Sequence, residues 1–245
     1  MNGAPDIAVF ADWENVALGA RESGLGTLDP KRVTDRLLEK GRLIVRRAYS
    51  NWARFGRDRK PLHNAGFDLI DVPPSTHAGK NGADIRLVCD ALDLAHHKPH
   101  LGVFCLITGD SDFSPLARKL RENGREVLGI SVRSCTSPVL VQACDTFWFY
   151  DDLRPDVAEA TPDPEKDAAV ELVRATAERL IGDREAPVHG SQIKQAIKRK
   201  RPEFNESRYG YKRFGELLED ARKRGALSLT EHPPSGGWIV TEAEA

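Results

Sequence analysis

Short apolar segments recur along the first 150 residues of the chain, in the pattern of strands in a parallel sheet. Each segment is rich in Val, Ile and Phe and is apolar almost throughout, as expected for strands that are buried on both faces. The predicted strands are Ile7–Ala11, Leu43–Ala48, Phe67–Val72, Val103–Thr108, Val127–Val132 and Phe147–Tyr150.

Helical periodicity fills the sequence between these strands. Helices are predicted to begin at Pro30, to run from Ala83 to His96, and to run from Ser114 to Asn123 before Gly124. The apolar side chains expected to face the sheet are Val33, Leu37 and Leu38 in the first helix and Ile85, Val88, Cys89 and Leu92 in the second. Alternating strands and helices predict a doubly wound α/β domain with right-handed crossovers.

After residue 150 the pattern changes. Residues 151–165 contain three prolines and an excess of acidic side chains without any periodicity, which indicates a linker. The elements predicted beyond it are helices Ala168–Leu180, Gln192–Arg199 (capped by Ser191) and Tyr211–Arg224, then a hairpin of Leu227–Thr230 and Trp238–Val240. Three helices and a two-stranded wing form a winged helix-turn-helix. We therefore expect an α/β domain at residues 1–150 and a small winged-helix (α+β) domain at residues 166–245.

Composition narrows the class of protein. Hydrophobic residues make up 40% of the 245 residues and charged residues 30%, the balance of a soluble globular protein. The four cysteines have no paired spacing, so we interpret them as buried thiols in a reducing compartment. No apolar run is long enough for a membrane span, and the N-terminus lacks the pattern of a signal segment. We expect a cytoplasmic protein that does not bind membranes.

Acidic side chains follow the predicted strands at the points where the strands end. Asp12 comes directly after the first strand, and Asp84 opens the helix that follows the third. Asp110 and Asp112 follow the fourth strand. Because the carboxyl ends of parallel strands share one edge of a sheet, these four carboxylates should converge. A Mg²⁺ or Mn²⁺ ion would relieve their repulsion and could activate a water molecule for phosphodiester hydrolysis.

Each carboxylate also has a simpler interpretation. Asp84 and Asp112 could merely cap helices, and Asp12 could merely accept bonds from loop amides at a strand end. An Asp-x-Asp pattern also occurs in haloacid-dehalogenase phosphatases, which place the nucleophilic pair after the first strand. Here that position holds Asp12-Trp13-Glu14, which disfavours a phosphatase.

Candidate substrate-binding residues lie near the same edge. Lys80, in a glycine-containing loop, could pair with the scissile phosphate or could be a solvated loop lysine. After the second strand, Trp52 and Arg54 combine an aromatic ring with a cation, as in sites that hold single-stranded nucleic acid. The alternative is a basic loop with one buried aromatic. The sequence has no GxxxxGK[ST] phosphate loop and no supported Ser-His-Asp arrangement.

Three segments carry a resemblance to a known family. VFADWENV (9–16), KNGADI (80–85) and TGDSDFSPLARKLRENGREVLGI (108–130) are similar to the NYN domain of the PIN-like nuclease superfamily, in its LabA-like branch. The resemblance implies a PIN-like fold and a metal-dependent ribonuclease that leaves 5′-phosphate and 3′-hydroxyl ends. By matching positions, it assigns metal binding to Asp12, Asp84, Asp110 and Asp112. It assigns Asn15 to orienting a ligand or touching substrate.

The C-terminal segment is locally basic, although the net charge of the chain is −1. From Ser191 to Arg224 there are eleven Lys or Arg against five Asp or Glu, a local charge of +6. The continuous basic run is Lys198, Arg199, Lys200 and Arg201. Such a run suits phosphate contacts or a solvated helix face. Residues 166–241 resemble the OST-HTH/LOTUS domain, which implies RNA binding and, in some animal members, helicase recruitment.

These observations predict a Mg²⁺- or Mn²⁺-dependent endoribonuclease that acts on RNA, with single strands favoured, and whose C-terminal domain supplies RNA affinity. The alternative is a non-catalytic RNA-binding or regulatory adaptor that keeps the PIN-like fold. The OST-HTH resemblance leaves room for a protein partner, and a homodimer is compatible with the sequence.

Overall fold

The structure is a computed structural model that describes residues 4–72, 82–153, 163–182, 188–232 and 237–241. The chain divides into two compact units, residues 1–154 and 155–245, each with its own hydrophobic core. Asp151 and Asp152, which the sequence assigned to the linker, lie in a helical turn of the first unit, Tyr150–Leu153. Both carboxylates there accept hydrogen bonds from Arg133, one from its backbone N–H and one from its guanidinium.

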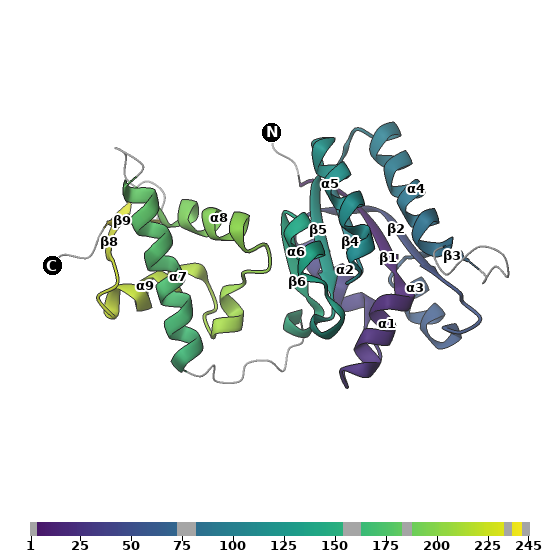
Figure 1. Ribbon diagram of the computed structural model, residues 1–245, viewed down its shortest axis with the longest axis horizontal. Helices are drawn as coiled ribbons and strands as arrows, with labels where there is room; N and C mark the ends of the chain where they lie inside the picture. Colours follow the sequence, from purple (N-terminus) through teal and green to yellow (C-terminus); the bar gives the residue numbers. More distant parts are fainter. Residues whose placement is uncertain (1–3, 73–81, 154–162, 183–187, 233–236, 242–245) are drawn as a thin grey trace. The chain divides into compact units, whose positions relative to one another are not determined.

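A six-stranded parallel sheet forms the centre of the first unit (Figure 1). Its strands are β1 (Asp6–Asp12), β2 (Arg42–Ser50), β3 (Asp68–Asp71), β4 (Leu101–Ile107), β5 (Glu126–Ser131) and β6 (Thr146–Phe149). The order across the sheet is β3-β2-β1-β4-β5-β6, so the direction of winding reverses between β1 and β4. Open α/β sheets bind ligands beyond the carboxyl ends of the strands at such a reversal. All six predicted strands are confirmed.

Helices cover both faces of this sheet, which confirms the predicted doubly wound α/β fold (Figure 1). They are α1 (Trp13–Glu22), α2 (Pro30–Leu38), α3 (Arg59–Asn64), α4 (Gly82–His97), α5 (Ser114–Glu122) and α6 (Pro138–Ala143). The buried side chains of α1, α2 and α3 form one core with the sheet, and those of α4, α5 and α6 form the other.

Local sequence signals explain where several helices begin and end. The Asp29 carboxylate accepts a hydrogen bond from the Lys31 backbone N–H at 3.0 Å, so it caps α2 just before Pro30. Gly124, with a φ of 71°, follows the end of α5. The sequence analysis missed α1, which begins at Trp13 immediately after β1. Its buried face consists largely of alanine and glycine, which gives a weak amphipathic pattern.

The predicted apolar faces of α2 and α4 need correction. In α4, Ile85 is 63% exposed and Cys89 is exposed, whereas Leu87, Ala91 and Ala95 are buried against the sheet. Small alanines let the helix pack closely on a sheet whose own side chains are bulky, and the longer apolar side chains are left at the margin. In α2, Val33 and Leu37 are buried as expected, whereas Leu38, the last helical residue, is 55% exposed.

The second unit consists of helices and a small antiparallel sheet, as predicted for a winged-helix domain. Its elements are α7 (Asp163–Gly182), β7 (Val188–His189), α8 (Gly190–Lys200), a helical turn (Glu206–Tyr209), α9 (Phe214–Lys223), β8 (Ser228–His232) and β9 (Gly237–Thr241). The strand order is β7-β9-β8. Ser191 does not cap α8 as expected, because His189 is the N-cap and its backbone N–H donates to the Gln192 side chain at 2.9 Å.

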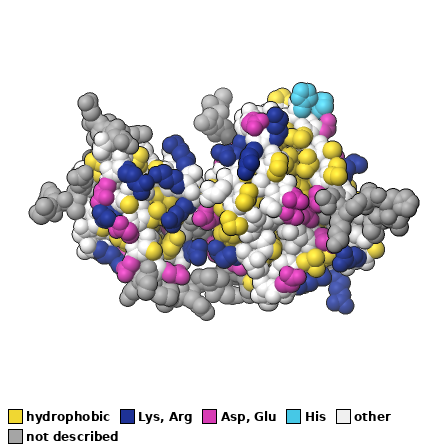
Figure 2. Space-filling model, viewed as in Figure 1, with side chains coloured by type: hydrophobic (Ala, Val, Ile, Leu, Met, Phe, Trp, Pro, Cys, Tyr) yellow, Lys and Arg dark blue, Asp and Glu magenta, His cyan; other side chains and the backbone are white. Residues whose placement is uncertain are grey.

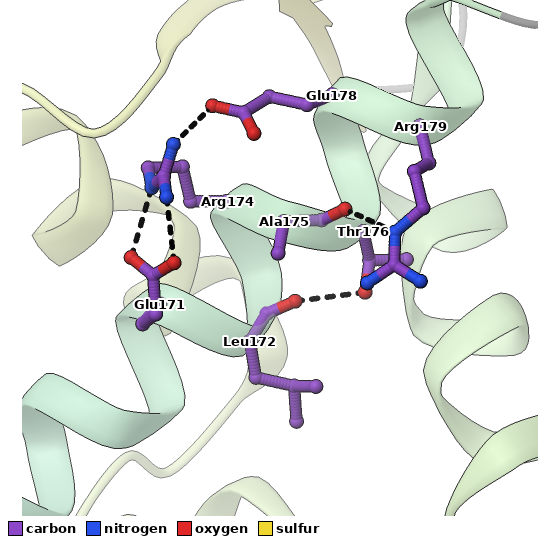
Figure 3. A network of polar contacts seen from close by, with 7 residues as sticks. All are labelled: Glu171, Leu172, Arg174, Ala175, Thr176, Glu178 and Arg179. Atoms are coloured by element: carbon purple, nitrogen blue, oxygen red, sulfur yellow. Dashed lines mark hydrogen bonds and ion pairs between the residues drawn. The ribbon is translucent and has the colours of Figure 1, made fainter.

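Helix α7 separates an apolar face from a charged one. Ala169, Val173 and Ala177 are buried in the core of the second unit. On the exposed face the Arg174 guanidinium bonds both oxygens of Glu171, at 2.6 and 2.8 Å, and also bonds Glu178 (Figure 3). Among the described residues, no helix combines the length and apolar character that crossing a bilayer requires.

Candidate active site

Asp12 is the last residue of β1 and lies almost buried at the carboxyl end of the sheet, with 7% exposure. Its carboxylate accepts hydrogen bonds from the Asn15 backbone N–H at 3.4 Å and from the Thr108 hydroxyl at 3.2 Å. Burial, followed by the negative charge of Asp84, raises the pKa of Asp12 to about 7 in spite of these two donors. The fold therefore holds this carboxylate where its charged form is poorly stabilised.

Three further carboxylates approach from other segments. Asp84 lies half-buried in the first turn of α4, and burial followed by the charges of Asp110 and Asp112 raises its pKa. The Asp110 carboxylate accepts the Asp112 backbone N–H at 2.9 Å, which shapes the turn after β4. The charge of Asp110 also acts on Asp12. Asp84 and Asp110 thus lie within electrostatic range of Asp12, and Asp110 and Asp112 within electrostatic range of Asp84. We call these four residues the carboxylate rim.

The carboxylate rim has little compensation for its negative charge. In the described part of the chain, none of its four members forms an ion pair with Lys, Arg or His. Figure 2 shows one group of acidic side chains on this face of the first unit, with further acidic and basic side chains spread around it. Unpaired carboxylates at a partly buried position are unfavourable, so a cation is the ligand that this group best accommodates.

The donor set of the rim fits a hard divalent cation. All four side chains offer carboxylate oxygens, the ligands that Mg²⁺ and Mn²⁺ prefer. Among the described residues, however, no three His, Cys, Asp or Glu side chains stand close enough together to hold an ion as they are. The four carboxylates therefore act on one another at Coulombic range without meeting at one point.

Backbone and side-chain bonds between two segments position the rim. The Gly109 backbone N–H donates to the Asn15 side-chain oxygen at 2.8 Å, which ties the turn after β4 to α1. The Asp110 backbone N–H donates to the Thr108 hydroxyl at 3.2 Å. Glycine is required at position 109, since a Cβ there would lie 2.2 Å from the Cys135 carbonyl oxygen. Asn15, expected to orient a ligand or touch substrate, has its amide oxygen engaged in holding this turn.

The expected stacking role of Trp52 is wrong. Trp52 is 5% exposed, and its indole N–H donates to the Ile70 carbonyl at 3.0 Å, so its ring is part of the core and cannot stack on a base. Arg54 is exposed and pairs with Glu14 at 2.6 Å. Lys80 lies outside the described residues.

Sequence reasoning missed Asp58, which fixes the beginning of α1. Its carboxylate is buried at 2% exposure and accepts bonds from the Trp13 indole N–H at 3.1 Å and from Arg21 at 3.3 Å. Trp13 directly follows Asp12, so this contact restrains the rim. The signal in the sequence was hidden, because Asp58 stands within RFGRDRK and resembles a solvated residue of a basic loop.

The basic run of the second unit lies at the C-terminal end of α8. Arg199, Lys200 and Arg201 are exposed and Lys198 is half-buried. Within the described residues, Arg199, Lys200 and Arg201 form no ion pair. Cations at this end complement the helix dipole, and their exposed heads remain available to an anionic ligand.

Comparisons with known proteins agree with this architecture. The model of the NYN domain matches residues 6–151, and that of the OST-HTH/LOTUS domain matches residues 162–233. An uncharacterised protein of Methanocaldococcus jannaschii is 27% identical over 118 residues, which are 48% of this chain and 46% of that protein. The chain thus spans about half the length of this relative.

A solved structure supports the fold of the first unit. A protein of unknown function from Vibrio parahaemolyticus superposes with a TM-score of 0.55 at 24% identity, covering 62% of this chain and 97% of the other. With the family matches, the parallel sheet and the acidic residues at its carboxyl edge identify the class of protein. The chain belongs to the NYN domain family, within the PIN-like nuclease superfamily, and carries an OST-HTH/LOTUS domain after its NYN domain.

Proposed function

We propose that this protein is a metal-dependent endoribonuclease that hydrolyses RNA at the carboxylate rim. The observation that supports the proposal is that four acidic side chains from three segments act on one another electrostatically at the carboxyl edge of the sheet, without an ion pair in the described part of the chain. Asp12, Asp84, Asp110 and Asp112 would hold Mg²⁺ or Mn²⁺. The ion would supply an activated water and neutralise charge that builds on the phosphoryl oxygens.

The surrounding residues would hold the carboxylates of the rim in a fixed orientation toward the scissile phosphate. The Asn15 backbone N–H and the Thr108 hydroxyl orient the two oxygens of Asp12. The bond from Gly109 to the Asn15 side chain holds the Asp110 turn beside α1. Metal sites depend on such outer contacts to orient their ligands. By resemblance to PIN enzymes, the products would carry 5′-phosphate and 3′-hydroxyl ends.

The second unit would supply affinity for RNA. Arg199, Lys200 and Arg201 are exposed cations on one helix end, and neutralising phosphates there would release counterions. Single-stranded RNA is the favoured substrate.

A second candidate function is that of an RNA-binding or regulatory adaptor. It is favoured by the absence, among the described residues, of three potential ligands close enough to hold an ion as they stand. An adaptor would retain the fold and the RNA affinity without turnover.

Incubation of the full chain with labelled single-stranded RNA separates the two candidates. We expect cleavage in Mn²⁺ or Mg²⁺, none in EDTA, and none by Asp110→Asn in either metal. The matched control is Asp93→Asn, an exposed aspartate of α4 that pairs with His97. Cleavage that survives Asp110→Asn would rule out the rim as its source. RNA binding without cleavage in either metal would favour the adaptor.

A further inference from the structure

A basic loop begins beside the carboxylate rim. β2 runs parallel to β1 with Tyr49 opposite Asp12, so the chain leaves β2 at the same edge of the sheet. The segment that follows, residues 51–60, is called the Arg54 loop here. It contains Arg54 and Arg57, together with Arg59 and Lys60, which are the first two residues of α3.

Buried contacts fix the Arg54 loop in place. Trp52 and Phe55 are buried at 5% and 2% exposure, and the Trp52 backbone N–H donates to the Asp71 carboxylate at 3.1 Å. Further along, buried Asp58 accepts the Trp13 indole N–H at the beginning of α1. A loop anchored in this way presents its exposed side chains without a large ordering cost when a ligand binds.

The cations of this loop differ in their partners. Arg57, Arg59 and Lys60 are exposed and form no ion pair within the described residues. Arg54, whose side chain is 60% exposed, pairs with Glu14 at 2.6 Å. The Glu14 carboxylate therefore contacts Arg54 of this loop, and its charge also acts on Asp84 of the carboxylate rim.

We propose that the Arg54 loop is a phosphate subsite beside the carboxylate rim, which an RNA strand occupies by displacing Glu14 from the Arg54 guanidinium. The inference rests on the proposed action on RNA and adds where the strand is held. A phosphate offers the guanidinium two oxygens as a carboxylate does. An exposed ion pair contributes little free energy, so replacing Glu14 by a phosphate at Arg54 costs little. Arg57, Arg59 and Lys60 extend the contact along the strand.

The test is binding of a fluorescent single-stranded RNA to the full chain in EDTA, measured by anisotropy over a range of KCl concentrations. Arg54→Ala should weaken binding by about fivefold and lower the slope of log K against log salt by about 0.7, the value for one phosphate contact on a single strand. Glu14→Gln removes the competitor and leaves the cation, so it should tighten binding by about twofold. The double variant should bind as Arg54→Ala does.

The matched control is Arg42→Ala. Arg42 is also an exposed arginine, paired with Asp6 at 2.7 Å, but it lies at the opposite end of β2. Its removal should change neither affinity nor slope. As a second route, the triple variant of Arg57, Arg59 and Lys60 to Ala should lower the slope by about 2. An unchanged slope in both Arg54→Ala and the triple variant would overturn the subsite.

Weaker or unchanged binding by Glu14→Gln would overturn the exchange. These outcomes are distinguishable from failure of the proposed hydrolysis, because binding is measured without metal. Absence of RNA cleavage by the unaltered protein in Mn²⁺ and Mg²⁺ would refute the enzymatic proposal. The binding measurements in EDTA could still be interpreted.

Discussion

Helix α4 carries two aspartates with opposite surroundings. Asp90 accepts a hydrogen bond from the Tyr49 hydroxyl at 2.8 Å and pairs with Arg86 at 3.1 Å and Arg47 at 3.2 Å. The pKa of Asp84 is raised mainly by burial and then by the charges of Asp110 and Asp112. Asp84 has no ion pair in the described part of the chain. The first carboxylate is compensated by the fold and the second is not. Charge that a fold leaves uncompensated indicates where a ligand completes the structure.

The largest effects are expected when these two aspartates are replaced one at a time. Asp84→Asn should lower kcat/KM for RNA cleavage by at least about 100-fold, since it removes a ligand of the proposed ion. The free energy of unfolding should hardly fall. Asp90→Ala should lower the free energy of unfolding by about 2 kcal/mol, because it leaves the Arg47 guanidinium and the Tyr49 hydroxyl without their partner. Its cleavage rate per folded molecule should stay within about threefold of the original.

Urea unfolding and single-turnover cleavage on the same preparations provide the measurement. If Asp84→Asn instead unfolded the protein while Asp90→Ala abolished cleavage in folded protein, the distinction between the two aspartates would be reversed.

The same contrast applies to cations of the second unit. Arg174 is engaged by Glu171 and Glu178 (Figure 3), whereas Arg199, Lys200 and Arg201 have no ion pair among the described residues. Changing Lys198, Arg199, Lys200 and Arg201 together to Gln should weaken RNA binding by about tenfold and flatten its salt dependence. Arg174→Gln serves as the control and should leave both unchanged. Anisotropy in EDTA measures this, and a slope that stays constant would remove the basic run from the RNA-binding surface.

The strands and the convergence of acids followed from sequence because both depend on local pattern. Buried parallel strands are continuous apolar runs, and residues directly after them share one edge of the sheet. Asp12 and Asp110 could therefore be placed together without coordinates.

Other features depend on distant partners. The core position of Trp52 requires the Ile70 carbonyl from the neighbouring strand, and the role of Asp58 requires Trp13, 45 residues earlier. Neither contact produces a pattern in the neighbouring sequence from which it could be predicted. The buried face of α4 was assigned only in part, since Val88 and Leu92 pack against the core but Ile85 and Cys89 are exposed. Its periodic apolar residues compete with its alanines, and packing against the sheet decides between them.

The smallest effect concerns the stability of the metal-free protein. Since its pKa is about 7 in the fold and 3.8 ordinarily, Asp12 contributes stability that is fully present below pH 3.8 and is lost as the pH rises through 7. Asp12→Asn keeps an acceptor for Thr108 but carries no charge. In EDTA its free energy of unfolding should therefore exceed that of the original at pH 8, with the difference shrinking towards pH 4.

Urea titrations of both proteins at several pH values measure this difference. Adding Mn²⁺ at pH 8 should stabilise the original protein and not Asp12→Asn, because a ligand that binds only the folded state stabilises it in proportion to its affinity. A carboxylate that destabilises the fold without a metal ion and stabilises it when the ion is bound has the behaviour of a metal ligand. If Asp12→Asn were less stable than the original in EDTA at pH 8, Asp12 would be a structural residue whose charge the fold compensates, as it compensates that of Asp90.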